Sequence, residues 1–292
     1  MLKHRETSKF VVKSSFTFLI FLLHFFSTKT LADLPITVEN LLTKNDEIKL
    51  SFNVSYANAD TTKVIAAVGE QRTNSDIYTF TLGGRYGLSD TTEIYSRISA
   101  AADDIRTYSD IDSIGLKSKH KQLSQFIIGV NFQFYDDTYS SALLSFAELT
   151  LFENTVLNGS KYVYLKAGKF GLTAHKAIDP VVLSISAGLH HRWLREVNNK
   201  DRNPGDLLFI NPNFRFTVNN EVTLTGGVQF NFRTQDIVDD EWTGIRKSQT
   251  DLELGIDYAS SEKLKFNLTI TTDISGNSGA KANIGWRYKL GN

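Results

Sequence analysis

The sequence is short of several residue types that would otherwise indicate a function. Its 292 residues include no cysteine, one methionine and four prolines, and the formal net charge is zero. The absence of cysteine excludes disulfides, thiolate metal sites and cysteine nucleophiles. A balanced charge is untypical of proteins that bind nucleic acid, because phosphate recognition needs an excess of basic residues. We therefore expect no nucleic-acid partner.

After residue 32 the sequence also lacks any apolar run of the roughly 20 residues that a transmembrane helix needs. Residues 1–32 have the features of a cleaved signal peptide: a basic start, the short apolar core FTFLIFLLHFF and the small residues Thr30 and Ala32 at the cleavage site. The alternative is an N-terminal membrane anchor. We expect the mature chain to begin at Asp33, outside the cytoplasm.

What the remaining sequence has in abundance is alternation of apolar and polar residues, the pattern of β-strands. About twelve segments of roughly ten residues show it, the length of a tilted membrane strand. They lie within residues 47–292, and residues 33–46 before them are expected to form a periplasmic arm or a plug, with a disordered lead-in as the alternative. Within residues 141–151 the alternation changes phase between Phe146 and Leu149, which predicts a β-bulge.

The links between these segments alternate in length. Long polar links fall at residues 57–76, 103–123, 196–205 and 234–247, and short turns at 89–92, 135–140, 218–220 and 260–263. This order is typical of an outer-membrane barrel with long extracellular loops and short periplasmic turns. A soluble β-sandwich is the alternative, but the signal peptide and the aromatic residues near strand ends favour the barrel. The predicted fold is all-β, a transmembrane antiparallel β-barrel of about 12 strands in the bacterial outer membrane, in contact with lipid and lipopolysaccharide.

In such a barrel the charged face of each strand lines the lumen, because a charge that faces lipid costs about 2–4 kcal/mol near the midplane. The hairpin spacing is expected to bring Asp257 near Lys265 and Arg85 near Glu93. The cations of the periplasmic half form either a positively biased constriction for anionic solutes or one half of a wall of paired charges. The predicted lumen-lining charged residues are Lys49, Arg85, Glu93, Arg97, Arg215, Arg233, Asp251, Glu253, Asp257, Lys265, Asp273 and Arg287.

The sequence contains no convincing catalytic or metal-binding pattern. Ser184 and Ser186 share the parity of His190, but they lie about 13–20 Å from it along a strand, too far for a serine–histidine pair. DIDSIG at 110–115 matches a calcium loop only in part, and DIVDDE at 236–241 is a further acidic stretch. We therefore predict no catalytic residue, no metal site, no cofactor and no enzymatic activity.

The last strand resembles the sorting signal of outer-membrane barrels, through Asn283, Gly285, Tyr288 and Leu290. The resemblance implies the barrel assembly machinery as a partner. In addition, LPITVENLL at 34–42 followed by FTLGGRYGLSDTTEI at 80–94 resembles the outer-membrane transporter family that is linked to meta-pathway phenol degradation. That resemblance implies passage of small, aromatic molecules, and it supplies no binding residues.

These observations lead to one expected function and two alternatives. The expected function is a passive channel or porin for a small-molecule solute, with aromatic and anionic molecules as candidates. One alternative is a secretion pore for an extracellular, amyloid-like polypeptide, with residues 33–45 as its plug. The other is a structural or adhesive surface barrel whose long loops bind partners.

Overall fold

The computed structural model describes residues 42–290, apart from 66–68, 110–115, 137–140, 156–160, 198–199, 244–245 and 277. The predicted signal peptide and residues 33–41 of the predicted arm lie outside the described residues, as do residues 291–292. Within the described ranges there is no helix with the length and hydropathy needed to cross a membrane.

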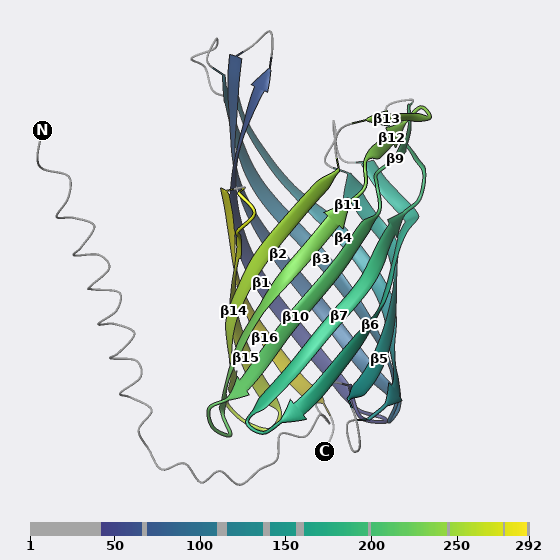
Figure 1. Ribbon diagram of the computed structural model, residues 1–292, viewed down its shortest axis with the longest axis vertical. Helices are drawn as coiled ribbons and strands as arrows, with labels where there is room; N and C mark the ends of the chain where they lie inside the picture. Colours follow the sequence, from purple (N-terminus) through teal and green to yellow (C-terminus); the bar gives the residue numbers. More distant parts are fainter. Residues whose placement is uncertain are drawn as a thin grey trace, which may run out of the picture. The chain divides into compact units, whose positions relative to one another are not determined.

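Twelve strands close into one antiparallel barrel, which confirms the predicted fold class (Figure 1). Each strand pairs with its neighbour in the chain order once the short loop strands are set aside, and β1 closes the ring against β16. The barrel strands are β1 (Ile48–Ile65), β2 (Gly69–Ser89), β3 (Thr92–Ser109), β4 (Leu116–Tyr135), β5 (Ala142–Thr155), β6 (Lys161–Ile178), β7 (Val181–Arg192), β10 (Leu207–Thr217), β11 (Val222–Arg233), β14 (Lys247–Ala259), β15 (Leu264–Asp273) and β16 (Ser278–Leu290).

The two ends of the barrel differ in their connections. The tight links of β2 to β3, β6 to β7 and β10 to β11 share one end with the start of β1 and the end of β16, since Ile48 pairs with Leu290. We call this the short-turn end. The opposite end, the long-loop end, carries the hairpin of β1 and β2 and the loop strands (Figure 1). At the long-loop end the links from β7 to β10 and from β11 to β14 are long, as the sequence predicts, whereas β15 and β16 are joined there by only a few residues.

Two of the predicted long links, however, consist mainly of strand. β1 and β2 stay paired as far as Ile65 and Gly69, and β3 and β4 as far as Thr107 and Leu116. Their residues beyond the apolar stretch are mainly polar, so the alternation that marks a membrane strand ends before the hydrogen bonding does. The prediction of irregular loops over 57–76 and 103–123 was therefore wrong in secondary structure, and right in placing polar segments at one end.

The other two predicted long links together form a separate four-stranded sheet at the long-loop end (Figure 1). Arg202 and Asp236 join its two inner strands through an ion pair of 2.5 Å. The sheet therefore ties the link after β7 to the link after β11. Its strands, in the order β13-β12-β9-β8, are β8 (Arg195–Val197), β9 (Lys200–Asn203), β12 (Asp236–Val238) and β13 (Glu241–Thr243).

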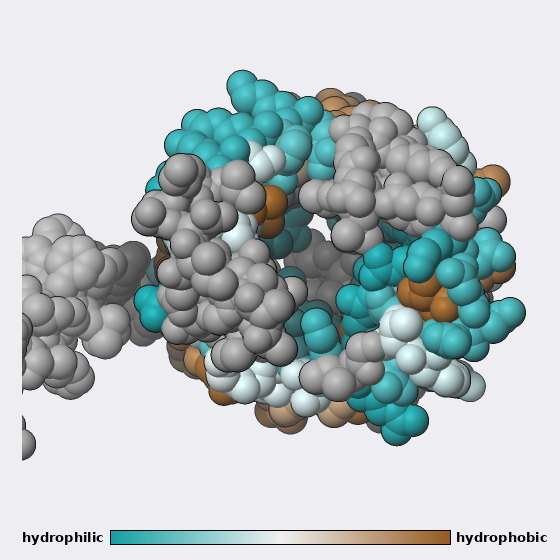
Figure 2. Space-filling model, turned by 90° about the horizontal axis from the view of Figure 1, so that it is seen from above, coloured by the Kyte–Doolittle hydropathy of each residue, from teal (hydrophilic) through white to brown (hydrophobic). Residues whose placement is uncertain are grey.

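The apolar residues of the barrel strands point outward. On β2, Phe80 and Leu82 are 46% and 56% exposed, and they alternate with Thr79, Thr81 and Gly83 on the inner face. Viewed into the long-loop end, the barrel encloses a central opening, with hydrophilic residues at the rim and hydrophobic residues at the outer perimeter (Figure 2). An apolar exterior around a polar interior is the arrangement of a membrane barrel and the inverse of a soluble sandwich.

Candidate functional site in the barrel lumen

The charged residues that the sequence singled out for the lumen lie on barrel strands. Each lies on a barrel strand at a position that alternates with outward-facing apolar residues, as Arg215 does between the exposed Phe214 and Phe216. They are distributed as follows: Lys49 on β1, Arg85 on β2, Glu93 and Arg97 on β3, Arg215 on β10, Arg233 on β11, Asp251, Glu253 and Asp257 on β14, Lys265 and Asp273 on β15, and Arg287 on β16.

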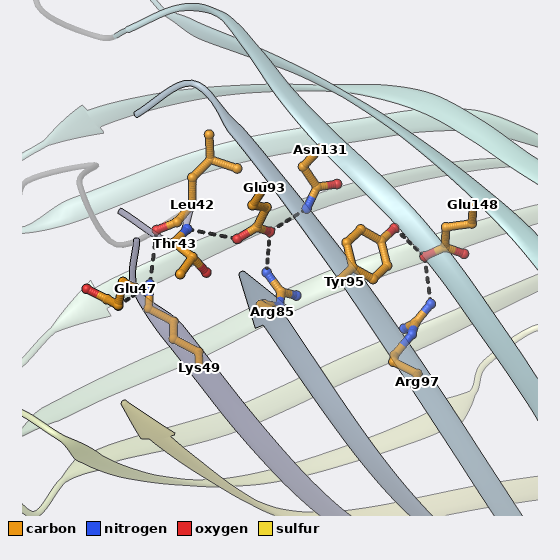
Figure 3. Close-up of polar contacts among 10 residues, drawn as sticks. All are labelled: Leu42, Thr43, Glu47, Lys49, Arg85, Glu93, Tyr95, Arg97, Asn131 and Glu148. Carbon is orange, nitrogen blue, oxygen red and sulfur yellow. Dashed lines mark hydrogen bonds and ion pairs between the residues drawn. The ribbon is translucent and has the colours of Figure 1, made fainter. Parts of the chain in front are cut away.

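Glu93 is the centre of a buried polar cluster near the short-turn end (Figure 3). Its carboxylate accepts hydrogen bonds from Arg85 Nη1 at 2.9 Å, Asn131 Nδ2 at 2.6 Å and the backbone N–H of Thr43 at 2.8 Å. The first contact is the pair expected across the β2–β3 hairpin. Three donors, one of them charged, compensate for the burial of the carboxylate. Glu93 thereby joins three neighbouring strands and the segment before β1.

That preceding segment, residues 42–47, docks on the inner wall. The carbonyl of Leu42 accepts a hydrogen bond from Lys49 Nζ at 3.0 Å (Figure 3), and Glu47 pairs with Lys49 and Lys289 at 3.4 and 2.6 Å. Leu42, like Thr43, is almost fully buried. The end of the predicted arm is thus part of the lumen wall.

Gly87 makes this docking sterically feasible. A Cβ atom at this position would lie 1.9 Å from the carbonyl oxygen of Lys44, and Asn45 forms a parallel bridge with Gly87. Any other residue would push residues 43–45 off the wall. In the sequence Gly87 is one residue of the stretch FTLGGRYGLSDTTEI, and its contact with the arm had no signal in the local pattern.

Glu148 organises a second polar cluster deeper in the barrel (Figure 3). Its Oε1 accepts hydrogen bonds from the Tyr95 hydroxyl at 2.8 Å and from Arg97 Nη2 at 2.6 Å. The guanidinium carbons of Arg85 and Arg97 each lie 5.7 Å from the centroid of the Tyr95 ring. Sequence reasoning missed Tyr95 and Glu148, although both have the parity of the residues that it selected.

Next to Glu148 lies an aromatic cluster on the inner face. The rings of Phe146 and Phe209 have centroids 6.1 Å apart, and Lys169 Nζ lies 5.5 and 4.6 Å from them. The predicted bulge between Phe146 and Leu149 was wrong. β5 stays in register with both β4 and β6 over these residues, and its nearest irregularity lies between Thr150 and Phe152. The phase changes because Phe146 is an apolar residue that faces the lumen.

At the short-turn end, Arg287 forms an ion pair of 3.3 Å with Asp257. The expected Asp257–Lys265 pairing was wrong in register, since Lys265 lies opposite Ala259 and Asp257 opposite Asn267. Among the described residues, neither Arg215 nor Lys265 has a carboxylate within ion-pairing distance. This part of the wall therefore carries more positive than negative charge.

The acidic residues nearer the long-loop end are arranged differently. Asp251 and Asp273 face one another in register across β14 and β15, and Gln249 donates a hydrogen bond of 2.9 Å to Asp251. Glu253 lies opposite Thr271. Along β15 the inner wall thus changes from basic at the short-turn end, with Lys265, to acidic nearer the long-loop end, with Asp273.

Arg233 lies at the end of β11, where the barrel meets the four-stranded sheet. It pairs with Asp236 at 3.0 Å, and Asp236 also receives a hydrogen bond from Arg202. Partial burial alone would raise the pKa of Asp236, but the hydrogen bond from Arg202 and the charges of both arginines hold this pKa below its ordinary value of 3.8. The carboxylate thus stays ionised and bridges the barrel and the sheet.

The residues of the predicted assembly signal lie on β16, and the strand ends at Leu290. Tyr288 and Leu290 are exposed on the outer face, opposite Leu50 and Ile48 of β1. Asn283 and Gly285 have the inward parity. Their recognition by the assembly machinery stays a prediction.

No arrangement suited to catalysis or metal binding was found among the described residues. Ser184 Oγ bonds to Asn213 Oδ1, and His190 lies in register with Lys169 and Leu207. Within the described part of the chain, no group of three or more histidine, aspartate or glutamate side chains is placed to hold a metal ion. Of the two acidic stretches, 110–115 lies outside the described residues and 236–241 forms β12, a turn and the start of β13.

The fold is similar to those of solved outer-membrane barrels. An outer membrane channel from Pseudomonas putida F1 superimposes with a TM-score of 0.64 at 10% identity, over 85% of this chain and 97% of that chain. The NanC porin gives 0.50 at 11% identity, over 82% and 100%. The translocator domain of the autotransporter NalP from Neisseria meningitidis gives 0.50 at 10% identity, over 84% and 89%.

At these identities the likeness shows the fold alone, and the similar barrels include both channels and a translocator. Comparison with protein families finds no match, and comparison with curated proteins finds no relative.

Proposed function

We propose that the chain is an outer-membrane barrel that acts as a passive channel for small molecules. The observation that carries the proposal is the inversion of the barrel, with apolar side chains outside and charged and small polar side chains around a central opening (Figure 2). Such a wall suits a hydrated pore, because charged side chains inside it keep water while the exterior meets lipid. The solved barrels of similar fold that are channels support the same reading.

The orientation and the partners follow from this proposal. The short-turn end faces the periplasm and the long-loop end faces the cell exterior, as in other barrels of this class. The outer apolar band contacts membrane lipid, with lipopolysaccharide at the long-loop end. Insertion by the assembly machinery through β16, and export by a signal peptide, belong to the same proposal.

The lumen charges favour small anions at the short-turn end. Arg85 forms an ion pair with Glu93, and Arg287 with Asp257. These pairs favour the wall of paired charges, one of the two arrangements that the sequence left open. Arg215 and Lys265 add positive charge that the neighbouring strands do not balance. A modest selectivity for anions over cations is therefore part of the proposal. Passage of aromatic molecules rests on the resemblance to the phenol-degradation family.

Planar-bilayer recording of the purified, full-length mature protein tests the channel directly. We expect discrete current steps in potassium chloride and, under a salt gradient, a reversal potential that indicates anion preference. Arg215→Gln with Lys265→Gln should reduce this preference, whereas Lys281→Gln, which removes an exposed cation of β16, should change it less. A protein that inserts and never conducts would contradict the proposal.

A secretion pore is the second candidate, and the docked residues 42–47 favour it, because they would be displaced when a polypeptide passes. Deletion of 33–46 separates the two functions. If these residues obstruct the lumen, the deletion raises the conductance severalfold, and Glu93→Gln, which weakens the hydrogen bond to Thr43, does so in part. The control is Glu253→Gln, an inner-face carboxylate on β14 far from the arm in sequence. Unchanged conductance after the deletion would remove the support for a plug.

A further inference from the structure

Lys169 is an inner-face cation whose neighbours are mainly aromatic. Its ammonium lies 4.6 Å from the centroid of the Phe209 ring and 5.5 Å from that of Phe146. Ring faces attract a cation electrostatically, but they do not use its three N–H donors as a carboxylate would. Among the described residues, no acceptor lies within hydrogen-bonding distance of this ammonium.

The two rings are fixed in place by glycines on the neighbouring strands. Gly171 pairs with Phe146 and Gly188 with Phe209. A Cβ at either glycine would lie 2.6 or 2.7 Å from the ring that covers it. The rings therefore lie directly on the backbone of β6 and β7. Phe209 is almost fully buried and Phe146 only partly, so Phe146 is the apolar surface that a solute can reach.

The nearest acid does not neutralise this site. Glu148 is in register with Lys169, but its Oε1 is held by Tyr95 and Arg97 at 2.8 and 2.6 Å. Lys169 and Arg97 together carry two positive charges against the single charge of Glu148. The local excess is one positive charge beside an apolar ring.

From this geometry we propose that Lys169, Arg97 and Phe146 form a lumenal binding site for small aromatic monocarboxylates. The carboxylate accepts hydrogen bonds from Lys169 and from N–H groups of Arg97, and the ring of the solute packs against Phe146. A neutral aromatic molecule lacks the negative charge that would pair with the Lys169 ammonium. A dianion carries a second negative charge, which the carboxylate of Glu148 would repel. The inference rests on the proposed channel, for which it names a solute class.

Benzoate is the probe, and isothermal titration with the full-length protein in detergent is the measurement. We expect wild-type protein to bind benzoate at least tenfold more tightly than acetate, which lacks the ring, and than benzamide, which lacks the charge. Lys169→Met keeps the apolar stem and should weaken benzoate binding tenfold or more. Phe146→Leu should weaken benzoate and leave acetate unchanged. The matched control is Lys281→Met, which removes an inner-face cation without aromatic neighbours and should bind as wild type does.

Bilayer recording separates this inference from the proposed channel. Benzoate that binds should lower the potassium chloride current of wild type and not that of Lys169→Met. A conducting protein whose benzoate affinity is absent, equals that for acetate or is unchanged in Lys169→Met would overturn the site and leave the channel standing. A protein that binds benzoate through Lys169 and never conducts would overturn the channel and leave the site. Heat-modifiable migration on gels checks that each variant folds.

Discussion

At the scale of single residues, the inner wall is determined by where side chains are small as much as by where they are charged. Gly171 and Gly188 leave room for two phenylalanine rings, and Gly87 leaves room for the backbone of the arm. A bulky side chain at these positions would displace either a ring or a neighbouring strand. Glycine in a strand often marks such a close approach.

The first prediction concerns Gly171. In Gly171→Ala the new Cβ would lie 2.4 Å from the carbonyl oxygen of Ala187 and 2.6 Å from Phe146. Since the first contact is with backbone, the strand must shift, and we expect a loss of about 1–3 kcal/mol in the free energy of unfolding. Gly84→Ala is the control, because its Cβ would meet nothing closer than 3.9 Å. Reversible urea unfolding in detergent compares them, and equal stabilities would contradict the close approach.

At the scale of elements, the sequence predicts a strand best where the strand also crosses the membrane. Such a strand needs both a regular backbone and one apolar face, so segments such as 222–232 and 264–274 stand out by alternation alone. Beyond the bilayer a strand needs a regular backbone but no apolar face. The extensions of β1 to β4 therefore had no apolar pattern from which they could be predicted. The four-stranded sheet was equally hidden, because its strands are three or four residues long and are held by Arg202, Arg233 and Asp236.

The second prediction concerns that sheet and its pH dependence. The pKa of Asp236 is lowered in the folded protein, so its contribution to stability is present above the ordinary value of 3.8 and is lost as the pH falls through the lowered pKa. Hydrogen exchange of the β9 and β12 amides should therefore accelerate on acidification below about pH 4, relative to barrel strands. Asp236→Asn should exchange faster at neutral pH and lose this acid dependence. An unaltered pH profile in the variant would contradict the role of Asp236.

At the scale of the whole molecule, alternation, link lengths and charge parity were enough to predict a closed barrel with its apolar face outward. The charged lumen positions could be predicted because each alternates with residues that face outward, as Arg287 does with Trp286 and Tyr288. What could not be predicted was which side chains of non-adjacent strands meet on the inner wall. Glu93 with Thr43, and Phe146 with Phe209, are brought together over the strands that lie between them, which local periodicity does not encode.

We propose that the inner face lines a conducting pore, and the absence of cysteine makes a direct test of this possible. Thr269→Cys places the only thiol on the inner face of β15, and Leu268→Cys places it on the exposed outer face one residue away. The measurement is the single-channel current before and after addition of a charged, membrane-impermeant methanethiosulfonate. We predict a lasting change of current for Thr269→Cys and none for Leu268→Cys. The same response from both variants, or no current from either, would contradict the account.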